Sequence, residues 1–385
     1  NSMKSLGSCI DFNSSDECII NGIGIGSLRQ SETPLDFGNS GTAARLILGL
    51  VSTYPIETHF IGDESLSQRP MKRVTEPLID FGANFNLRNS EFLPIEVKGT
   101  EYPIPITHEM KVASAQVKSA IMFAGLNTPG ITTIIEKEKT RDHTETLFKY
   151  YGYEINIEEK DGKNFISFEG QKVLNPVNIK VPGDPSSAAY PVVAGLICKD
   201  SKIKIKSVLL NPTRDGIYKC LDEMGANIRY SNKKSEAGEI TYDMEVSSST
   251  LNPIDVPASR APSMIDDYPI LAIAASMANG TSIFRGLSEL KVKESDRLLG
   301  IYNILSKNGI HTSIEDDNLI INGNVEGPKG GALIETNLDH RIAMSSIILG
   351  MVSDDPIKVD DIETIKTSFP DFIELMKKLG AKLTA

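Results

Sequence analysis

Three ionisable side chains that could act on an anionic substrate lie within one short stretch, residues 292–297, which reads Val-Lys-Glu-Ser-Asp-Arg. If a helix includes this stretch, Lys293 and Arg297 are four residues apart on one face, and Glu294 lies three residues before Arg297. Two cations around one carboxylate can bind an anion while the carboxylate transfers a proton. Taken alone, the same spacing is better explained by a solvated helix start with one ion pair. The rest of the chain favours a site.

Four predicted buried helices begin with small or polar residues that could bind anions. These starts are 38–42, 114–116, 183–187 and 339–341. A helix N-terminus presents free N–H groups and a positive partial charge, so several of them facing one cleft would form an anion site. Each alone fits an ordinary cap, but the four together, each with an Arg, Gln or Gly, favour a binding site. The Gly-rich turn at 38–43 matches neither the Walker loop nor the dinucleotide fingerprint.

A repeated pattern along the chain would position these residues. Six amphipathic segments each end in a glycine, and the glycines are spaced roughly 70 to 84 residues apart: Gly7, Gly82, Gly152, Gly225, Gly309 and Gly380. After most of them come two alternating strands joined by a polar turn, for example 153–157 and 165–168. The pattern predicts a structural unit that recurs along the whole chain.

A second set of helices follows the same period. Five segments start with small or polar residues and then become almost wholly apolar: 42–50, 114–126, 186–196, 265–278 and 340–352. A helix that is apolar all round is buried on all sides. Each unit therefore combines one exposed helix, one buried helix and short strands, which is an α/β class of structure.

The two sets of helices are unequal, six against five. No buried helix precedes the first exposed one at 3–7, so we expect about 50 residues of a full repeat to be absent before Asn1. On this expectation the domain formed by residues 1–181, with its first unit incomplete, is looser than the domain formed by 182–385. The chain as printed is then expected to be inactive until the missing segment is restored.

Composition narrows the class of protein. A length of 385 residues suggests two domains, and a net charge of −11 argues against a nucleic-acid partner. The sequence has no run of about 18 apolar residues and no signal-peptide core, which predicts a protein without a membrane span. The four cysteines and five histidines lack metal-ligand spacing. We expect a reduced, cytoplasmic location and no zinc.

With these residues in hand, the sequence resembles the 5-enolpyruvylshikimate-3-phosphate synthase family over essentially all 385 residues. The motifs that carry the resemblance are 36–43 (DFGNSGTA), 68–71 (QRPM), 114–119 (SAQVKS), 140–145 (TRDHTE), 183–187 (GDPSS), 264–269 (MIDDYP), 293–297 (KESDR) and 339–344 (DHRIAM). The SAQVKS and TRDHTE forms are similar to those of the bacterial class II branch.

The resemblance implies a two-domain enolpyruvyl transferase fold built from repeated βαβαββ units, an inside-out α/β barrel. In that family the buried helices point their N-termini at an interdomain cleft, and the domain crossover would fall near 181–182 here. The implied reaction joins shikimate 3-phosphate to phosphoenolpyruvate and releases phosphate through a tetrahedral intermediate. It needs no metal or organic cofactor, and a monomer is expected.

The resemblance also implies roles for particular residues. Asp266 would handle the 5-hydroxyl and Glu294 the methylene proton, because two acids in different environments can hold different protonation states. The cations would hold the anionic groups of the two substrates. Arg69, Arg297 and Arg341 would hold phosphoenolpyruvate, and Ser114, Gln116 and Arg141 would hold shikimate 3-phosphate. The other implied substrate-binding residues are Ala115, Lys293, Asp266 and Gly41. Gly41 stands where glyphosate-insensitive class II members have alanine, so glyphosate is expected to compete with phosphoenolpyruvate.

Three departures from the family pattern bear on these roles. The family's N-terminal Gly-Asp-Lys-Ser motif, with its catalytic lysine, is not in the sequence. Lys366 lies one position earlier than the lysine that often precedes Thr-Phe-Pro near the C-terminus. Ala115 replaces the second serine of a pair that many members have, so one hydroxyl is lost.

Two other interpretations compete with this one. The sister enzyme that acts on UDP-N-acetylglucosamine shares the fold and the chemistry, but it usually carries a reactive cysteine in a loop near an arginine. None of the four cysteines here lies in such a Gly-rich loop. The other alternative is a non-catalytic remnant that only binds a ligand or a partner, and the absence of the lysine motif keeps it open. Turnover of phosphoenolpyruvate with shikimate 3-phosphate would separate the two.

Overall fold

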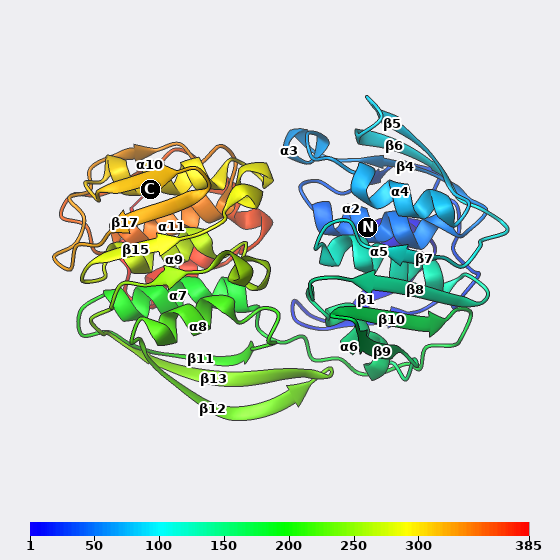
Figure 1. Ribbon diagram of the computed structural model, residues 1–385, viewed down its shortest axis with the longest axis horizontal. Helices are drawn as coiled ribbons and strands as arrows, with labels where there is room; N and C mark the ends of the chain where they lie inside the picture. The colour runs from blue at the N-terminus through cyan, green and yellow to red at the C-terminus, as the bar shows by residue number, and fades with distance from the viewer. Residues whose placement is uncertain (385) are drawn as a thin grey trace. The chain divides into compact units, whose positions relative to one another are not determined.

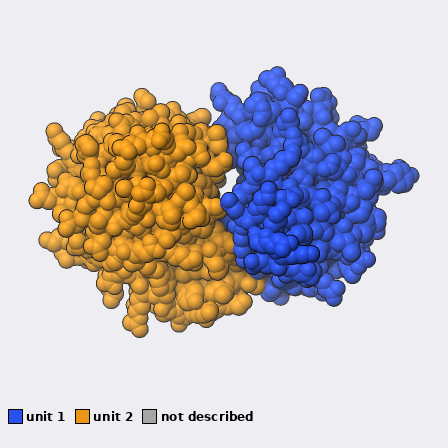
Figure 2. Space-filling model, in the orientation of Figure 1, with its two compact units in different colours: residues 1–178 blue, residues 179–385 orange. Residues whose placement is uncertain are grey.

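The computed structural model describes residues 1–384, which form two compact units, 1–178 and 179–384 (Figure 2). The division after Asn178 and the sequence-based boundary at 181/182 both lie in the segment that joins the last strand of unit 1 to the first helix of unit 2. Each unit has its own hydrophobic core. Within residues 1–384, no helix combines the length and the apolar character that a bilayer crossing requires.

Unit 1 contains two complete copies of one strand-and-helix pattern (Figure 1). In each copy two strands pair in parallel around a buried helix, an exposed helix follows, and an antiparallel hairpin closes a four-stranded sheet. The first copy consists of β3 (Leu35–Asp36), α2 (Gly41–Ser52), β4 (Glu57–Ile61), α4 (Lys72–Asp80), β5 (Asn84–Arg88) and β6 (Phe92–Lys98), with a short α3 (Glu64–Ser67) inserted. The second consists of β7 (Thr107–Glu109), α5 (Ala115–Leu126), β8 (Ile131–Glu136), α6 (His143–Tyr150), β9 (Asn156–Lys160) and β10 (Lys163–Glu169).

Unit 1 starts with a helix and a hairpin that match only the end of the pattern. They are α1 (Ser2–Ser5), β1 (Cys9–Phe12) and β2 (Cys18–Asn21). The two strands form a separate two-stranded sheet whose residues are almost all exposed.

Unit 2 follows the same order of elements, completely over residues 255–322. Its first copy has an isolated bridge at Gly183 in place of the leading strand, and among the described residues no hairpin follows its last helix. Its buried helices are α7 (Pro185–Ile197), α9 (Tyr268–Ser276) and α11 (His340–Gly350), and its exposed helices are α8 (Gly216–Glu223), α10 (Arg297–Lys307) and α12 (Phe372–Lys378). The strands are β11 (Lys202–Leu209), β12 (Asn227–Glu236), β13 (Glu239–Ser247), β14 (Asp255–Val256), β15 (Thr281–Phe284), β16 (Thr312–Glu315), β17 (Asn318–Asn322), β18 (Leu333–Ile334) and β19 (Lys358–Val359). Three short 3-10 helices, η1 (Ala258–Ser263), η2 (Ser288–Val292) and η3 (Glu363–Thr367), lie in the connections.

The predicted repeat is confirmed at the level of individual turns. All six glycines have positive φ angles, between 76° and 107°, and each follows the end of an exposed helix. Side chains disfavour this left-handed conformation, so glycine ends each helix, and after all of them except Gly380 a hairpin follows. All five predicted buried helices are present as well, and the element order bears out the βαβαββ unit.

The buried helices pack at close range in each unit. In unit 1, a Cβ atom on Gly49 of α2 would lie 2.0 Å from the carbonyl oxygen of Ala120 in α5, so only glycine permits this approach. In unit 2, α7, α9 and α11 all contact one another and lie side by side in Figure 1. Close packing of rigid helices fixes the relative positions of their N-terminal residues.

Two predicted helix starts were wrong. The fourth buried helix was expected to begin at Ile265, but α9 begins at Tyr268, so Asp266 lies in the preceding turn. The second error concerns Lys293 and Glu294, which precede α10 because Asp296 caps that helix at the backbone N–H of Leu299. An aspartate in an extended or turn conformation is a strong N-cap, and it overrides the spacing that placed Lys293 on the helix.

Candidate active site

Aspartates precede the three buried helices of unit 2. Asp184 accepts a hydrogen bond from the backbone N–H of Ser187 at 2.8 Å, and Asp339 accepts one from that of Arg341 at 2.9 Å. Asp267 occupies the same position before α9 without a capping bond of its own. Because the helices pack together, these three carboxylates are brought into one region with the positive ends of the helix dipoles.

Arg297 lies at the centre of this region, and its side chain is only 1% exposed. Its Nε donates to Asp339 Oδ2 at 2.8 Å and its Nη1 to Asp266 Oδ1 at 3.1 Å. Its Nη2 lies 2.6 Å from Glu294 Oε2. Every nitrogen of the guanidinium therefore faces a carboxylate, as a buried charge requires.

The pKa of the Asp339 carboxyl reflects two opposing effects. Burial by itself would raise it, but the adjacent Arg297 guanidinium and its hydrogen bond hold the pKa of Asp339 below its usual range. Asp339 is thus a fixed negative charge that orients Arg297. Ser295 donates a further hydrogen bond to Asp339 at 3.0 Å, which ties the 293–297 segment to α11.

The convergence predicted from the 293–297 stretch is present, but a turn produces it rather than a helix face. Lys293 Nζ lies 3.9 Å from Asp266 Oδ1, and Glu294 reaches Arg297 from the turn before α10. The two acids that the family resemblance singled out, Asp266 and Glu294, therefore contact the two terminal nitrogens of one guanidinium. Their side chains are 23% and 16% exposed, so a ligand can reach both.

Arg341 forms the second cationic centre of unit 2. Its Nη1 donates to the backbone carbonyl of Asp266 at 2.7 Å and to Asp267 Oδ1 at 3.2 Å. Burial opposes its charge, but Tyr190 and the nearby aspartates raise its pKa, so it remains cationic. Arg214 extends the network by donating to Asp184 at 2.9 Å and to Ser186 at 3.0 Å.

His340 lies beside these cations at the start of α11. Burial and the neighbouring Arg341 lower the pKa of its imidazole to about 4, so the ring is neutral at pH 7. The unfolded chain, with a histidine pKa of about 6.5, binds a proton that the folded chain rejects between these two values. Folding stability associated with His340 is therefore full above pH 6.5 and is lost as the pH falls toward 4.

We expect His340→Asn to remove this pH dependence. The shift corresponds to roughly 3 kcal/mol between pH 7 and pH 4. Urea unfolding of both proteins at a series of pH values measures it, and the stability difference between wild type and variant should shrink or reverse as the pH falls. Parallel stability curves for the two proteins would contradict the assignment.

In unit 1, the start of α2 places Gly41 against Arg69. The Ser40 hydroxyl caps the helix at the backbone N–H of Ala43. A Cβ atom on Gly41 would lie 2.8 Å from Arg69 Nη1 and 3.0 Å from its Cζ. The glycine thus leaves room for the guanidinium directly over the N-terminal turn of α2, where an anion would find both N–H groups and a cation.

Gln116 joins the starts of α2 and α5. Its side-chain amide donates to Thr42 Oγ1 at 2.7 Å, and its Oε1 accepts from Arg45 Nη1 at 2.5 Å. Arg45 also donates to the carbonyl of Pro70, the residue after Arg69. These bonds bring the predicted residues Gly41, Arg69 and Gln116 into one region of unit 1.

The other predicted residues of unit 1 lie on or near the same helix. Ser114 is the N-cap of α5 and accepts from the backbone N–H of Val117 at 3.4 Å, and Ala115 is its first residue. Arg141 lies in the short segment between β8 and α6. All the predicted site residues of this unit are therefore at helix N-termini or in adjoining loops.

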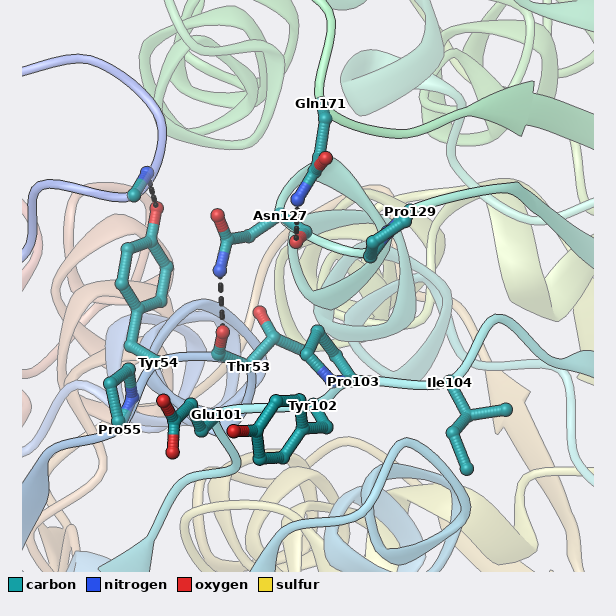
Figure 3. Close-up of a pocket in the computed structure, with 11 residues that line it drawn as sticks. Thr53, Tyr54, Pro55, Glu101, Tyr102, Pro103, Ile104, Asn127, Pro129 and Gln171 are labelled. Carbon is teal, nitrogen blue, oxygen red and sulfur yellow. Dashed lines mark hydrogen bonds between the residues drawn. The ribbon is translucent and has the colours of Figure 1, made fainter.

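A pocket of about 430 Å³ also occurs in unit 1, but at the other ends of these helices (Figure 3). Its lining includes Thr53 and Tyr54, just past α2, and Asn127, just past α5. Two 12-residue helices separate it from the predicted residues by roughly 18 Å. Prolines and aliphatic carbon dominate the rest of the lining, with Glu101 as its one acid among the described residues. We do not assign the substrate site to it.

Sequence reasoning missed several members of this polar network. Asp184, Asp267 and Asp339 were recognised only as parts of motifs, and Arg45 and Arg214 were not considered as site residues. An aspartate directly before a predicted buried helix was the available signal for Asp184, Asp267 and Asp339. The two arginines gave none, because their partners lie 25 to 71 residues away in the sequence.

Comparison with known proteins gives a consistent result. The family model described as EPSP synthase (3-phosphoshikimate 1-carboxyvinyltransferase) matches residues 1–376. The 3-phosphoshikimate 1-carboxyvinyltransferase of Paramagnetospirillum magneticum is 50% identical over 99% of this chain and 86% of its own length. That of Pseudomonas sp. strain PG2982 is 48% identical over 96% of this chain and 82% of its own length.

Solved structures agree with the sequence relatives. The EPSP synthase of Acinetobacter baumannii matches with a TM-score of 0.87 and 36% identity, covering 99% of this chain and 86% of that one. The enolpyruvyl transferase NikO of Streptomyces tendae, at 18% identity and a TM-score of 0.74, shares the fold. Given a family match over nearly the whole chain, relatives near 50% identity and the predicted repeat fold, this chain belongs to the EPSP synthase family.

Proposed function

We propose that this protein transfers the enolpyruvyl group of phosphoenolpyruvate to the 5-hydroxyl of shikimate 3-phosphate. In the addition step, the hydroxyl oxygen bonds to the enol carbon, the methylene carbon gains a proton, and the hydroxyl loses its own. In the elimination step, the C–O bond to phosphate breaks, phosphate leaves, and the new methyl group gives up a proton to restore the enol ether. The reaction thus needs one group to handle the hydroxyl proton and one to handle the carbon-bound proton.

The observation that carries this proposal is the shared contact of Asp266 and Glu294 with Arg297. Two acids that remain reachable by a ligand contact neighbouring nitrogens of one buried cation. We assign the hydroxyl proton to Asp266 and the methylene proton to Glu294. The positive charge of Arg297 offsets the repulsion between the two carboxylates, so they can lie close together.

Each unit, taken by itself, carries cations that suit the anionic groups of the substrates. We assign Arg69, Lys293, Arg297 and Arg341 to phosphoenolpyruvate, and Ser114, Gln116 and Arg141 to shikimate 3-phosphate, with Ala115 contributing backbone only. Arginine suits these roles because its planar fork pairs with carboxylate and phosphate alike. Among residues 1–384, no group of three or more His, Cys, Asp and Glu side chains is arranged to hold a metal ion.

Turnover of the two substrates tests the proposal. The purified protein, expressed from its complete gene, is incubated with phosphoenolpyruvate and shikimate 3-phosphate, and released phosphate and the enol ether product are measured. We expect phosphate only when both substrates are present, and none when UDP-N-acetylglucosamine replaces shikimate 3-phosphate. Binding without turnover would favour the non-catalytic alternative, and absence of both would overturn the proposal.

We further propose a cytosolic monomer. The described cysteines Cys9, Cys18, Cys198 and Cys220 are all unpaired thiols, which suits a reducing compartment. Sedimentation of the purified chain tests the oligomeric state.

Gly41→Ala should weaken inhibition by glyphosate more than it weakens binding of phosphoenolpyruvate. The added methyl group would lie 2.8 Å from Arg69 Nη1 and would displace that guanidinium. A ligand that is longer than phosphoenolpyruvate loses more from this displacement. Inhibition constants for glyphosate and KM values for phosphoenolpyruvate, measured on both proteins, check the prediction, and equal inhibition constants would contradict it.

A further inference from the structure

A lysine with no surface exposure lies between two buried carboxylates in unit 1. Lys118, on α5, has a side chain that is 0% exposed. Its Nζ lies 2.6 Å from Glu145 Oε1 and 3.2 Å from Glu136 Oε1, and both glutamates are almost completely buried. None of the roles proposed above uses this cluster, which we call the Lys118 triad (Lys118, Glu136 and Glu145).

Stability alone is a poor explanation for the triad. Removing three charged groups from water costs free energy that their mutual attraction recovers only partly, and well-packed apolar residues are often as stable or more so. The triad has two acids and one base, and Glu145 shows this cost. Burial raises the pKa of its carboxyl, and Lys118 only partly opposes the shift. Close buried ion pairs do, however, restrict the positions of the groups they join.

The two glutamates flank the segment that carries Arg141. Glu136 is the last residue of β8, and Glu145 lies in the first turn of α6. Within the segment, the Thr140 hydroxyl donates to Glu136 Oε1 at 2.5 Å, and the backbone N–H of Thr140 donates to the same oxygen at 3.3 Å. Lys118 therefore contacts the residues that flank the six-residue loop 137–142, and this loop contains Arg141.

The triad connects this loop to a second part of the site. Lys118 lies two residues after Gln116 on α5, the helix whose start also carries Ser114 and Ala115. The neighbouring Ser119 hydroxyl is 2.6 Å from that of Thr144, which adds a neutral contact between α5 and α6. A shift of Lys118 would thus move Arg141 relative to the residues at the start of α5.

We propose that Lys118 is a positioning residue for Arg141: its ammonium, bound to Glu136 and Glu145, sets where the Arg141 guanidinium stands relative to the N-terminus of α5. The identity of the ligand, shikimate 3-phosphate, rests on the function proposed above. The position of the loop does not, so the two can be tested separately.

The first test follows the loop without any ligand. Lys118→Met keeps an unbranched chain of all but the terminal atom and removes the charge. Ser119→Ala is the matched control because it removes only the neutral contact between the same two helices. Hydrogen exchange of the 137–142 amides should be at least tenfold faster in Lys118→Met and within about twofold of wild type in Ser119→Ala. Exchange in α2 should not change. Wild-type exchange of the 137–142 amides in Lys118→Met would overturn the proposal, even if the chain binds no shikimate 3-phosphate.

A second variant covers the case in which Lys118→Met fails to fold. The triple variant Lys118→Met, Glu136→Gln, Glu145→Gln removes all three charges at nearly constant volume, so it leaves no uncompensated buried charge. We expect it to melt near the wild-type temperature and still to exchange the 137–142 amides faster than wild type. Wild-type exchange in this folded variant would show that the charges do not hold the loop.

The second test asks whether Lys118 acts through Arg141. Calorimetric binding of shikimate 3-phosphate is measured for wild type, Lys118→Met, Arg141→Ala and the double variant. We expect Lys118→Met to weaken binding by about tenfold or more, since small displacements of a binding group are costly. In the Arg141→Ala background the same change should have less than about a twofold effect, which is the mark of a shared interaction.

Additive effects in this cycle would mean that Lys118 acts on the fold in general, and they would overturn the proposal. The KM for phosphoenolpyruvate gives an independent check and should stay within about twofold of wild type in Lys118→Met. If wild type itself fails to bind shikimate 3-phosphate, the proposed function fails, while the exchange measurements still decide the role of Lys118.

Discussion

Glu294→Gln should lower kcat by about 10²- to 10⁴-fold while leaving the binding of both substrates within a few-fold of wild type. The amide has nearly the shape of the carboxyl group and can still contact Arg297 Nη2, which lies 2.6 Å from the Glu294 side chain. It cannot, however, take up or deliver a proton at the methylene carbon. The loss should therefore fall on the chemical step, which steady-state kinetics and calorimetric binding distinguish.

Glu289→Gln is the matched control for this experiment. Glu289 is an exposed acid in η2, a few residues earlier in the chain, and it belongs to no part of the described network. Its substitution should leave kcat unchanged. If Glu294→Gln turns over at the wild-type rate, Glu294 does not transfer the proton, and the role passes to another group.

Arg297→Met should destabilise unit 2 by about 3–5 kcal/mol, because it leaves buried acids without their cation. Asp339 is fully buried, and Arg297 provides both its shortest ion pair and the effect that holds its pKa low. This loss is a large fraction of the 5–15 kcal/mol that separates a typical domain from its unfolded state. Urea unfolding, followed by a probe in unit 2, measures it.

Two further variants show whether the effect comes from burial. Arg285→Met breaks a comparable pair with two bonds of 2.7 Å to Asp255, but both side chains are about half exposed, so we expect a loss below about 1 kcal/mol. Adding Asp339→Asn to Arg297→Met should restore part of the lost stability. A loss from Arg297→Met no larger than that from Arg285→Met would show that the buried pair is not a strong constraint.

The repeat made the fold predictable from the sequence. Glycines with positive φ recur at the ends of the exposed helices, and wholly apolar segments form the buried ones. Both signals are local, because a helix end requires a particular residue at one position and a buried helix requires apolar residues along its length. The family motifs then supplied the candidate site residues, including Gly41, Gln116 and Arg341, and their roles stay predictions.

The pairing of charges was not predictable in the same way. The interpretation that Lys293 and Arg297 share a helix face was wrong, because the Asp296 cap delays the helix start. Arg297 was expected to bind substrate anions, and in the structure three carboxylates occupy it, two of them from residues 31 and 42 positions away. Such contacts depend on how distant helices pack, which no local spacing encodes. Likewise, the sequence showed Lys118 only as part of the 114–119 motif, and its contacts with Glu136 and Glu145 were not predicted.

The occupation of Arg297 by three acids has a consequence for the order of events at the site. An anion that reaches this guanidinium meets Asp339, Asp266 and Glu294, which already contact all three of its nitrogens. If phosphoenolpyruvate binds here as proposed above, we predict an exchange of partners, in which a carboxylate gives up its contact as the ligand gains one. Asp339 is anchored by Ser295 and by the start of α11, whereas Asp266 and Glu294 are the partners that a ligand can reach. The arrival of the anion would thus release the two acids assigned to proton transfer at the moment their substrate is in place.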